Sequence, residues 1–235
     1  MARGDAPAQP SGLSLPQQLP LPLETPAALT REDFVPSPAS APALAFIDSW
    51  PHWTATTAAL HGPSGSGKSH LVAIWAARSR AQIVSAKDLK GVQFDPSLPV
   101  VIEDVDSAPA NAMRDAALFA LLERARADAP VLLTGREPPP QWQTSLPDLA
   151  SRFSALLAFP LWAPDDALLA AIARKLFNDR QLTVPDAVID RMIRSLERSP
   201  AAIRDFVDQA DKRALAEGRA ISPVFVKDLL SEGER

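Results

Sequence analysis

The 235-residue chain contains no cysteine, which excludes disulfide bonds, thiol catalysis and cysteine-based metal sites. Histidine is scarce as well, and the spacing of His52, His61 and His70 is not that of metal ligands. No apolar run is long enough to span a membrane, and the N-terminal segment lacks the continuous apolar stretch of a signal peptide. We therefore expect a cytoplasmic protein that makes no contact with a membrane.

An excess of positive charge is also missing. The chain has 24 Lys and Arg residues against 28 Asp and Glu residues, for a net charge of −4. Proteins that cover nucleic acid carry basic residues in excess on one face, so the composition gives no indication of such a surface. Hydrophobic residues make up 46% of the chain, enough for one domain with a substantial core and a small second unit.

Among the residues that are present, the run Gly62-Pro63-Ser64-Gly65-Ser66-Gly67-Lys68-Ser69 stands out. It fits the phosphate-binding pattern G-x-x-x-x-G-K-[ST] without a mismatch. The glycines let backbone N–H groups point at one anion, and the helix that follows directs its positive dipole end there. Lys68 can reach the β- and γ-phosphates, and the Ser69 hydroxyl can ligate Mg²⁺. The run predicts a site for a purine nucleoside di- or triphosphate.

A chance Gly/Ser loop is the alternative to this interpretation, but the surrounding pattern argues against it. Short apolar runs alternate with helical patterns, which is typical of a parallel sheet with helices on both faces. The predicted strands are residues 57–61, 81–84, 99–102, 130–134 and 155–159. Helices are predicted before the first strand, at 41–50, and most clearly at 112–126. The loop at 62–69 therefore has the strand before it and the helix after it that the motif requires.

From Pro164 onward the strand patterns stop, and four helices are predicted at 165–180, 185–197, 200–217 and 222–232. Ser199-Pro200 and Ser222-Pro223 each place a capping residue before a proline at the first helical position. We therefore expect a flexible tail (1–27), an α/β nucleotide-binding domain (28–163) with a five-stranded parallel sheet, and a small all-α lid domain (164–235).

The predicted strand that ends at residue 102 leads into Glu103 and Asp104, with Asp106 two residues further on. After a phosphate-binding loop, carboxylates at such a strand end hold Mg²⁺ and orient the attacking water. A charged strand end that faces solvent is the alternative. The usual order is Asp then Glu, and here it is reversed. Because a base misplaced by about 1 Å can cost on the order of 10²-fold in rate, we expect metal binding by Ser69 and Glu103 but inefficient hydrolysis.

Three further polar residues each allow two interpretations. Thr134 either contacts the γ-phosphate or caps its strand. Arg152, just before the last predicted strand, is either a solvated loop residue or an arginine finger for a neighbouring subunit, an interaction worth about 10³–10⁵ in rate. Arg204 either contacts phosphates or pairs with Asp205 or Asp208 on the surface. The residue pattern alone leaves these alternatives open.

The first 27 residues are rich in proline, glutamine and alanine, and we expect them to be extended or disordered. Within them, Gln18 is followed by Leu19, Leu21 and Leu23, which alternate with prolines. Alternation in an extended chain places the leucines on one side, and the prolines reduce the entropy lost on docking. A generic proline-rich linker is the alternative. We expect the leucines to enter a groove on a partner.

Together these segments resemble the Hda family, the DnaA-related AAA+ regulators of bacterial replication initiation. The resemblance runs from about residue 18 to residue 230. It is most specific at Leu133–Pro139 and Leu146–Phe153, which resemble the sensor 1 and Box VII region of the family. Gly67–Leu71, which includes His70, is similar to the end of the family's Walker A motif.

The resemblance implies roles for residues at matching positions. Gln18, Leu19, Leu21 and Leu23 would bind the β subunit of DNA polymerase III, the sliding clamp. Phe34 and Val35 would lie against the adenine, Arg204 would be the sensor 2 arginine, and Arg152 would be the arginine finger. The family function implied is negative regulation of replication initiation. With ADP or ATP and Mg²⁺ bound, the protein would dock on the DNA-loaded clamp and promote hydrolysis of DnaA-bound ATP.

Some features depart from the relatives. Arg136 stands where they carry an acidic residue, and Glu103 stands where aspartate is usual, so weak self-hydrolysis is expected. The segment from 84 to 100 is too short for the helical insertion of DnaA, and no helix-turn-helix follows the lid. We therefore expect no direct sequence-specific DNA binding, and homodimer formation is left open. The alternative function is a self-hydrolysing AAA+ ATPase or loader, similar to a helicase loader.

Overall fold

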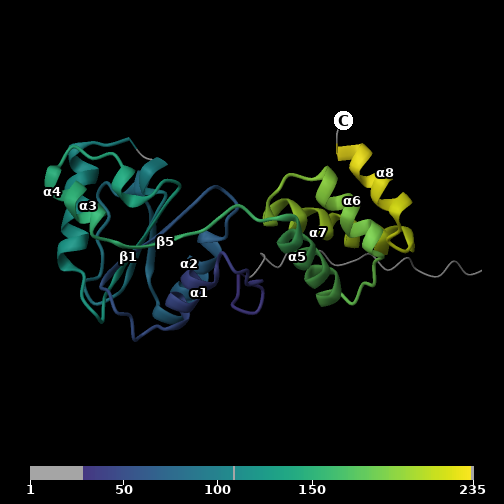
Figure 1. Ribbon diagram of the computed structural model, residues 1–235, viewed down its shortest axis with the longest axis horizontal. Coiled ribbons are helices and arrows are strands. Elements are labelled where there is room, and N and C mark those ends of the chain that lie inside the picture. The colour runs from purple at the N-terminus through teal and green to yellow at the C-terminus, as the bar shows by residue number, and fades with distance from the viewer. Residues whose placement is uncertain (1–28, 108, 234–235) are drawn as a thin grey trace, which may run out of the picture.

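The computed structural model describes residues 29–107 and 109–233. The tail motif with Gln18, Leu19, Leu21 and Leu23 lies outside these residues. Figure 1 shows two parts side by side, an α/β part that contains the sheet and a helical part formed by the last four helices. Within the described ranges, no helix is both long enough and apolar enough to cross a lipid bilayer.

The sheet of the α/β part has five strands, ordered β2-β3-β4-β1-β5, and every neighbouring pair is parallel. The strands are β1 (Thr57–His61), β2 (Gln82–Ser85), β3 (Val100–Glu103), β4 (Val131–Gly135) and β5 (Leu157–Pro160). Each lies within two residues of its predicted range, so the predicted five-stranded parallel sheet is confirmed. Because the strands are parallel, the segments that follow β1, β3 and β4 meet at one edge of the sheet.

Helices cover both faces of the sheet, as the alternating pattern predicts. The helices α1 (Ala41–Asp48) and α2 (Lys68–Ser79) cover one face, and α3 (Ala112–Arg124) and α4 (Pro147–Ser154) cover the other. Side chains of a strand alternate between the faces, so Val101 and Leu132 enter the core beneath α1 and α2. Their neighbours Ile102 and Leu133 enter the core beneath α3 and α4. Three short 3₁₀ helices lie in the connections, at Ala86–Asp88, Val105–Ser107 and Pro139–Gln141.

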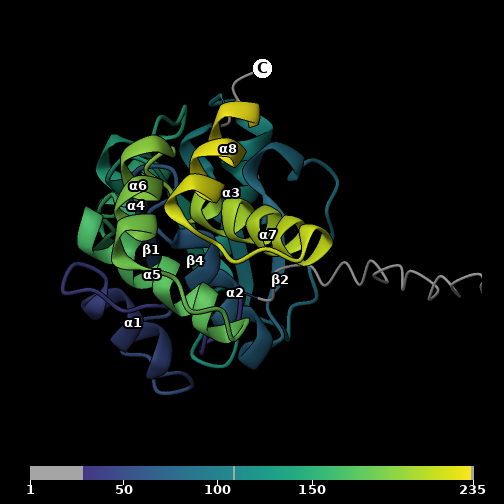
Figure 2. The same cartoon turned by 90° about the vertical axis from the view of Figure 1, so that its right-hand side faces the viewer.

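The helical part has its own core, and Figure 2 views the molecule from its side. Its helices are α5 (Asp166–Asp179), α6 (Asp186–Ser195), α7 (Pro200–Glu217) and α8 (Pro223–Gly233). Both predicted caps are present: the Ser199 hydroxyl accepts the N–H of Ala202 at 3.1 Å, and the Ser222 hydroxyl accepts that of Phe225 at 3.2 Å. The cap at Ser199 fixes where α7 begins, and this helix start faces the α/β part.

A buried ion pair between Arg114 and Asp115 at the start of α3 connects the segment after β3 to the segment before α4. Arg114 Nε donates to Asp115 Oδ1 at 2.9 Å, and a second guanidinium nitrogen donates to the Val105 carbonyl at 3.3 Å. Asp115 Oδ2 accepts the Ser145 N–H at 2.6 Å and the Thr144 hydroxyl at 3.0 Å. Burial by itself raises the pKa of Asp115, but these hydrogen bonds outweigh it and hold the pKa below its ordinary value. The pair thus joins the segment after β3 to the segment before α4.

We expect Asp115→Ala to lower the free energy of unfolding by about 3–5 kcal/mol, because it leaves the Arg114 charge buried without its partner. Urea unfolding followed by tryptophan fluorescence measures this change, since all five tryptophans precede residue 163. The matched control is Asp128→Ala, which removes an exposed partner of Arg126 in the same part of the molecule and should cost below about 1 kcal/mol. Equal losses in the two variants would contradict the prediction.

Candidate nucleotide-binding site

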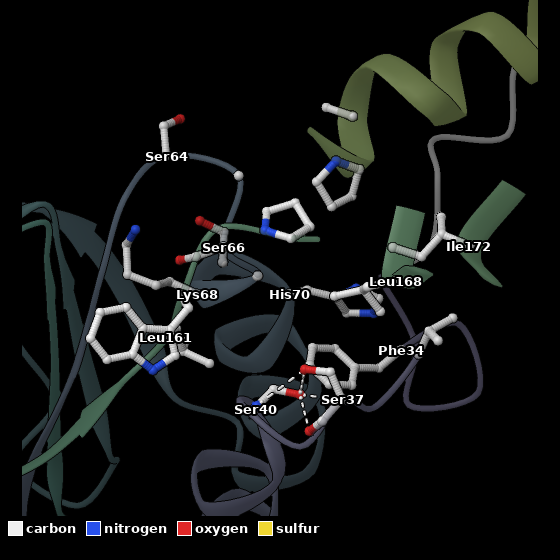
Figure 3. A pocket seen from close by; sticks show the side chains of 18 of the residues that line it. Phe34, Ser37, Ser40, Ser64, Ser66, Lys68, His70, Leu161, Leu168 and Ile172 are labelled. Atoms are coloured by element: carbon white, nitrogen blue, oxygen red, sulfur yellow. Dashed lines mark hydrogen bonds between the residues drawn. The ribbon is translucent and has the colours of Figure 1, made fainter. Parts of the chain in front are cut away.

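A cavity of about 340 Å³ lies between the carboxyl edge of the sheet and the helical part (Figure 3). Residues 64–70 of the phosphate-binding loop and the start of α2 form its floor. The segment 29–40, with Phe34 and Val35, forms one wall, and α5 and α7 contribute Leu168, Ile172 and Arg204 from the opposite side. The cavity therefore exists only because the two parts of the molecule meet here.

The loop backbone has the conformation of an anion cradle. Gly65 and Gly67 have φ of 74° and 97°, a region that side chains disfavour, and α2 begins directly after them at Lys68. The tip of the loop contacts the start of α7, because a Cβ on Gly65 would lie 3.1 Å from the Ser199 Cβ. The buried hydroxyl oxygen of Ser66 has no hydrogen-bond partner among the described residues. A cradle with an unsatisfied buried donor fits a phosphate group.

Lys68 lies inside this loop. Its ammonium group donates to the carbonyl oxygens of Gly62 at 2.7 Å and Pro63 at 2.9 Å. Burial lowers the pKa of Lys68, and the nearby carboxylates of Asp104 and Asp106 offset part of that effect. The lysine is thus held beside both the loop and the strand end of β3, where it can reach a phosphate chain laid along the loop.

The segment from Thr30 to Val35 is fixed by contacts to both parts of the molecule. His70 Nε2 lies 2.7 Å from the Thr30 carbonyl, so this nitrogen carries the proton and donates. The Phe34 and His70 rings pack edge to face, with 5.1 Å between their centroids. From α5, Lys175 pairs with Asp33 at 3.2 Å. Figure 3 shows the Phe34 and His70 side chains next to Leu168 and Ile172, so the wall assigned to the adenine is apolar.

Glu103 and Asp104, the two carboxylates at the end of β3, lie in different environments. Asp104 lines the cavity, and its φ of 56° marks a sharp turn of the backbone at the strand end. Glu103 is still the last residue of β3 and lies outside the set of described residues that line the cavity. The predicted metal ligand Ser69 lines the cavity, and so does Asp104, whereas Glu103 is outside the described lining. The positive φ at Asp104 accounts for the different positions of the two carboxylates, because it bends the chain at the end of β3.

Thr134 is buried at 1% exposure, and its hydroxyl oxygen accepts the N–H of Asp104 at 3.0 Å. Thr134 thus holds the strand end of β3, and its O–H proton remains available to a phosphate, so the structure is compatible with both alternatives. Among the described residues, no group of three or more Asp, Glu or His side chains forms a metal-binding cluster. Mg²⁺ would therefore take most of its ligands from phosphates and water, as it does in many nucleotide sites, and Ser69 and Asp104 are candidate protein ligands on the cavity wall.

Arg204, at the start of α7, lines the cavity. The surface pairing considered for it is not seen in the described part of the chain, since Asp208 pairs instead with Arg180. The guanidinium group of Arg204 is thus available to a phosphate.

Arg152 lies far from this cavity and in a helix rather than on a solvated loop, because it belongs to the last turn of α4. Its guanidinium group pairs with Glu123 and lies over the Phe119 ring, 5.1 Å from the centroid, both on α3. The side chain is 42% exposed. Figure 1 shows α3 and α4 at the end of the α/β part that is opposite to the helical part. Arg152 therefore cannot serve the cavity of its own chain.

The family comparison agrees with this geometry. The family model described as AAA domain matches residues 58–199, which is more than half of the chain. The chain belongs to the AAA domain family. The match begins in β1 and ends at the cap of α7, so it spans the phosphate-binding loop, the carboxylates at the end of β3 and Arg152.

Solved structures with the same fold include domain III of the replication initiation protein DnaA from Thermotoga maritima. It is 16% identical, with a TM-score of 0.70 over 88% of this chain and 97% of that domain. DnaA from Aquifex aeolicus bound to AMPPCP is also 16% identical, with a TM-score of 0.66 over 82% of this chain and 66% of that one. The RuvB Holliday junction branch migration motor of Thermotoga maritima is 15% identical, with a TM-score of 0.66 over 86% of this chain and 71% of that one.

At these identities the likeness shows the fold. The AAA domain protein spans about two thirds of the DnaA chain from Aquifex aeolicus.

Sequence reasoning missed residues of the site that lie in the connection after β5 and in the helical part. Trp162, Leu168, Ile172 and Ala201 all line the cavity, yet each belongs to a segment whose own pattern shows only a helix or a connection. Arg136 was noticed only as a departure from relatives, and it too lines the cavity. The proline after Ser199 was the one usable signal, because it marked the start of the helix that faces the loop.

We expect Lys68→Ala to weaken the binding of ADP and ATP at least about tenfold, because one cation directed at the phosphates is lost. Isothermal titration calorimetry measures the affinities, with Mg²⁺ present. The matched control is Lys90→Ala, which removes an exposed lysine away from the cavity and should leave the affinity unchanged. Equal affinity of Lys68→Ala and the unmodified protein would refute the assignment of the loop.

Proposed function

We propose that this AAA domain protein holds an adenine nucleotide and activates the ATPase of a DnaA-type partner, as a negative regulator of replication initiation in the manner of the Hda family. One observation carries the proposal. Arg152 is exposed on the face formed by α3 and α4, away from the cavity of its own chain. An arginine finger acts on a neighbour's nucleotide and needs this kind of position.

The nucleotide in this proposal is ADP or ATP with Mg²⁺, and its role is structural. The cavity is formed by both parts of the molecule, so a bound nucleotide joins the phosphate-binding loop to α7 through Arg204. The apolar wall at Phe34 and Val35 suits a purine ring. Support from the fold comes from DnaA of Aquifex aeolicus, which has a similar structure and binds AMPPCP.

Weak hydrolysis of its own nucleotide is part of this proposal, and the reversed order of Glu103 and Asp104 supports it. Of the adjacent carboxylates, only Asp104 lines the cavity, and its backbone N–H is held by Thr134. A general base must lie within hydrogen-bond reach of the attacking water. Glu103 ends β3 outside the described cavity lining, and its carboxylate is near enough to Lys68 to raise the pKa of that amine. Arg152, the candidate arginine finger, lies at the opposite end of the α/β part and so does not reach the nucleotide of its own chain.

Arg152 would act by placing its planar guanidinium fork against the charge that develops on the partner's γ-phosphate. It is held at rest by Glu123 and the Phe119 ring. Both members of the ion pair are exposed, and such pairs are worth up to about 1 kcal/mol, so the arginine can be released at small cost. The partner's triphosphate offers a stronger attraction than Glu123 does.

We expect Arg152→Ala to reduce the stimulated hydrolysis of DnaA-bound ATP by about 10³-fold, while nucleotide affinity stays unchanged. Arg152→Lys should restore little, because lysine lacks the planar fork. The measurement is the hydrolysis of labelled ATP preloaded on DnaA, with clamp and DNA present. Arg174→Ala is the matched control, since it removes another exposed, ion-paired arginine on a helix. Undiminished stimulation by Arg152→Ala would mean that DnaA supplies the chemistry and this protein only reshapes it.

The tail would provide the second contact of this regulator, by docking on the sliding clamp. We expect Leu21→Ala combined with Leu23→Ala to abolish clamp binding by the full chain, because both leucines would leave the clamp groove. The control variant combines Leu13→Ala with Leu15→Ala, two leucines of the same tail outside the motif. Surface plasmon resonance with immobilised clamp distinguishes them. Full clamp binding by a chain that lacks residues 1–27 would exclude the tail as the docking element.

The second candidate is a motor or loader that hydrolyses its own ATP, and the similar fold of the RuvB branch migration motor favours it. A turnover assay of the protein alone distinguishes the two. Turnover without DnaA that depends on Lys68 would support the motor. Turnover that needs DnaA, clamp and DNA together would support the regulator.

A further inference from the structure

Two arginines line the cavity without a partner. Across residues 29–107 and 109–233, the guanidinium groups of Arg136 and Arg204 form no hydrogen bond or ion pair, while Arg152, Arg174 and Arg180 are all paired. Arg204 was expected at the site from the family resemblance. Arg136 has no assigned role, and its position calls for a separate explanation.

The backbone of Arg136 is anchored at the start of the phosphate-binding loop. Arg136 is the first residue after β4, and β4 pairs with β1 so that Gly135 lies opposite His61. The Gly62 N–H donates to the Gly135 carbonyl at 3.2 Å. On its other side, the N–H groups of Arg136 and Glu137 both donate to Asp106 Oδ2, at 2.6 and 2.7 Å. The main chain is therefore fixed next to the loop while the side chain remains unpaired.

The packing of Gly135 limits where the next residue can go. A Cβ on Gly135 would lie 2.7 Å from the Trp142 ring, so the strand end is pressed against that indole. The indole N–H in turn donates to the Glu137 carbonyl at 2.7 Å. Trp142 is buried at 4% exposure and closes the side of the strand end away from the loop. Because Trp142 fills one side of the strand end, the Arg136 side chain extends on the other side, where it lines the cavity.

The charge balance of the cavity favours an anion near Arg136. Its guanidinium group is close enough to Lys68 to contribute to the lowered pKa of that amine. Lys68, Arg136 and Arg204 all line the cavity. Of the carboxylates, Asp33 and Asp104 line it, Asp33 is paired with Lys175, and Asp106 and Glu103 lie near enough to Lys68 to raise its pKa. Cations that face one another in a partly closed space repel, unless an anion lies between them. A chain of two or three phosphates on the loop would satisfy all three cations.

We propose that Arg136 is a phosphate-binding residue of this site, which contacts the β- or γ-phosphate from the sheet edge while Arg204 approaches from α7. It would reach the outer phosphates from the same strand end as Thr134, whose hydroxyl oxygen accepts the N–H of Asp104. Through this contact Arg136 would tighten the binding of a nucleotide that carries these phosphates. The inference rests on the nucleotide-binding part of the proposed function and not on the DnaA-type partner.

The test compares AMP, ADP and ATP binding to the full chain and to Arg136→Gln by isothermal titration calorimetry. We expect the variant to lose about tenfold or more in affinity for ADP and ATP and less than about twofold for AMP, which lacks the phosphates in question. Arg136→Lys should recover part of the loss, because it keeps the charge but not the fork. Arg194→Gln makes the same charge change at an exposed position on α6, outside the described cavity lining, and should bind as the unmodified protein does.

Each outcome has a distinct meaning. Equal ADP affinity of Arg136→Gln and the unmodified protein overturns the role of Arg136 and leaves the nucleotide site standing. A loss for AMP as large as that for ADP also overturns it, because the effect would then not involve the outer phosphates. If the unmodified protein binds none of the three nucleotides, both this inference and the nucleotide part of the proposed function fail. Thermal unfolding without nucleotide confirms that each variant is folded.

Discussion

The close approach of three strand ends at Gly62 is the constraint on which the rest of the site depends. Gly62 has φ of 148°, and a Cβ there would collide with the Leu161 carbonyl, the residue that follows β5. On its other side its N–H donates to Gly135 at the end of β4. Only glycine fits between these two backbones. This fit places the loop, the Arg136 segment and the connection to α5 within reach of one phosphate chain.

The nucleotide cavity also makes the two parts of the molecule depend on each other. The α/β part supplies the cradle and the apolar wall, and the helical part supplies Arg204 and the opposite wall. Without a ligand, the segment before α1 provides a connection between them, since Asp33 pairs with Lys175 of α5 and the Thr30 carbonyl accepts from His70 of α2. A bound nucleotide would add a second connection at the phosphates.

Helix α3 fixes the position of Arg152 on the face of the α/β part that lies away from the cavity. Its first turn contains the buried Arg114–Asp115 pair, which holds the segment after β3 and the segment before α4. Its last two turns contain Phe119 and Glu123, which hold the Arg152 side chain. Through one rigid helix, the acidic strand end near the cavity and the exposed arginine on the far face have a fixed geometry relative to each other.

Local patterns determined much of this protein. The short apolar runs of the buried strands, the Ser-Pro helix starts and the loop at 62–69 are each encoded by neighbours in the chain, so strands, helices and the phosphate cradle could be predicted from the sequence. Which carboxylate lines the cavity could not, because the turn at Asp104 depends on its bond to Thr134 in another strand. The places of Arg136 and Arg152 likewise followed only from strand order and helix packing, since these bring together residues that the sequence keeps far apart.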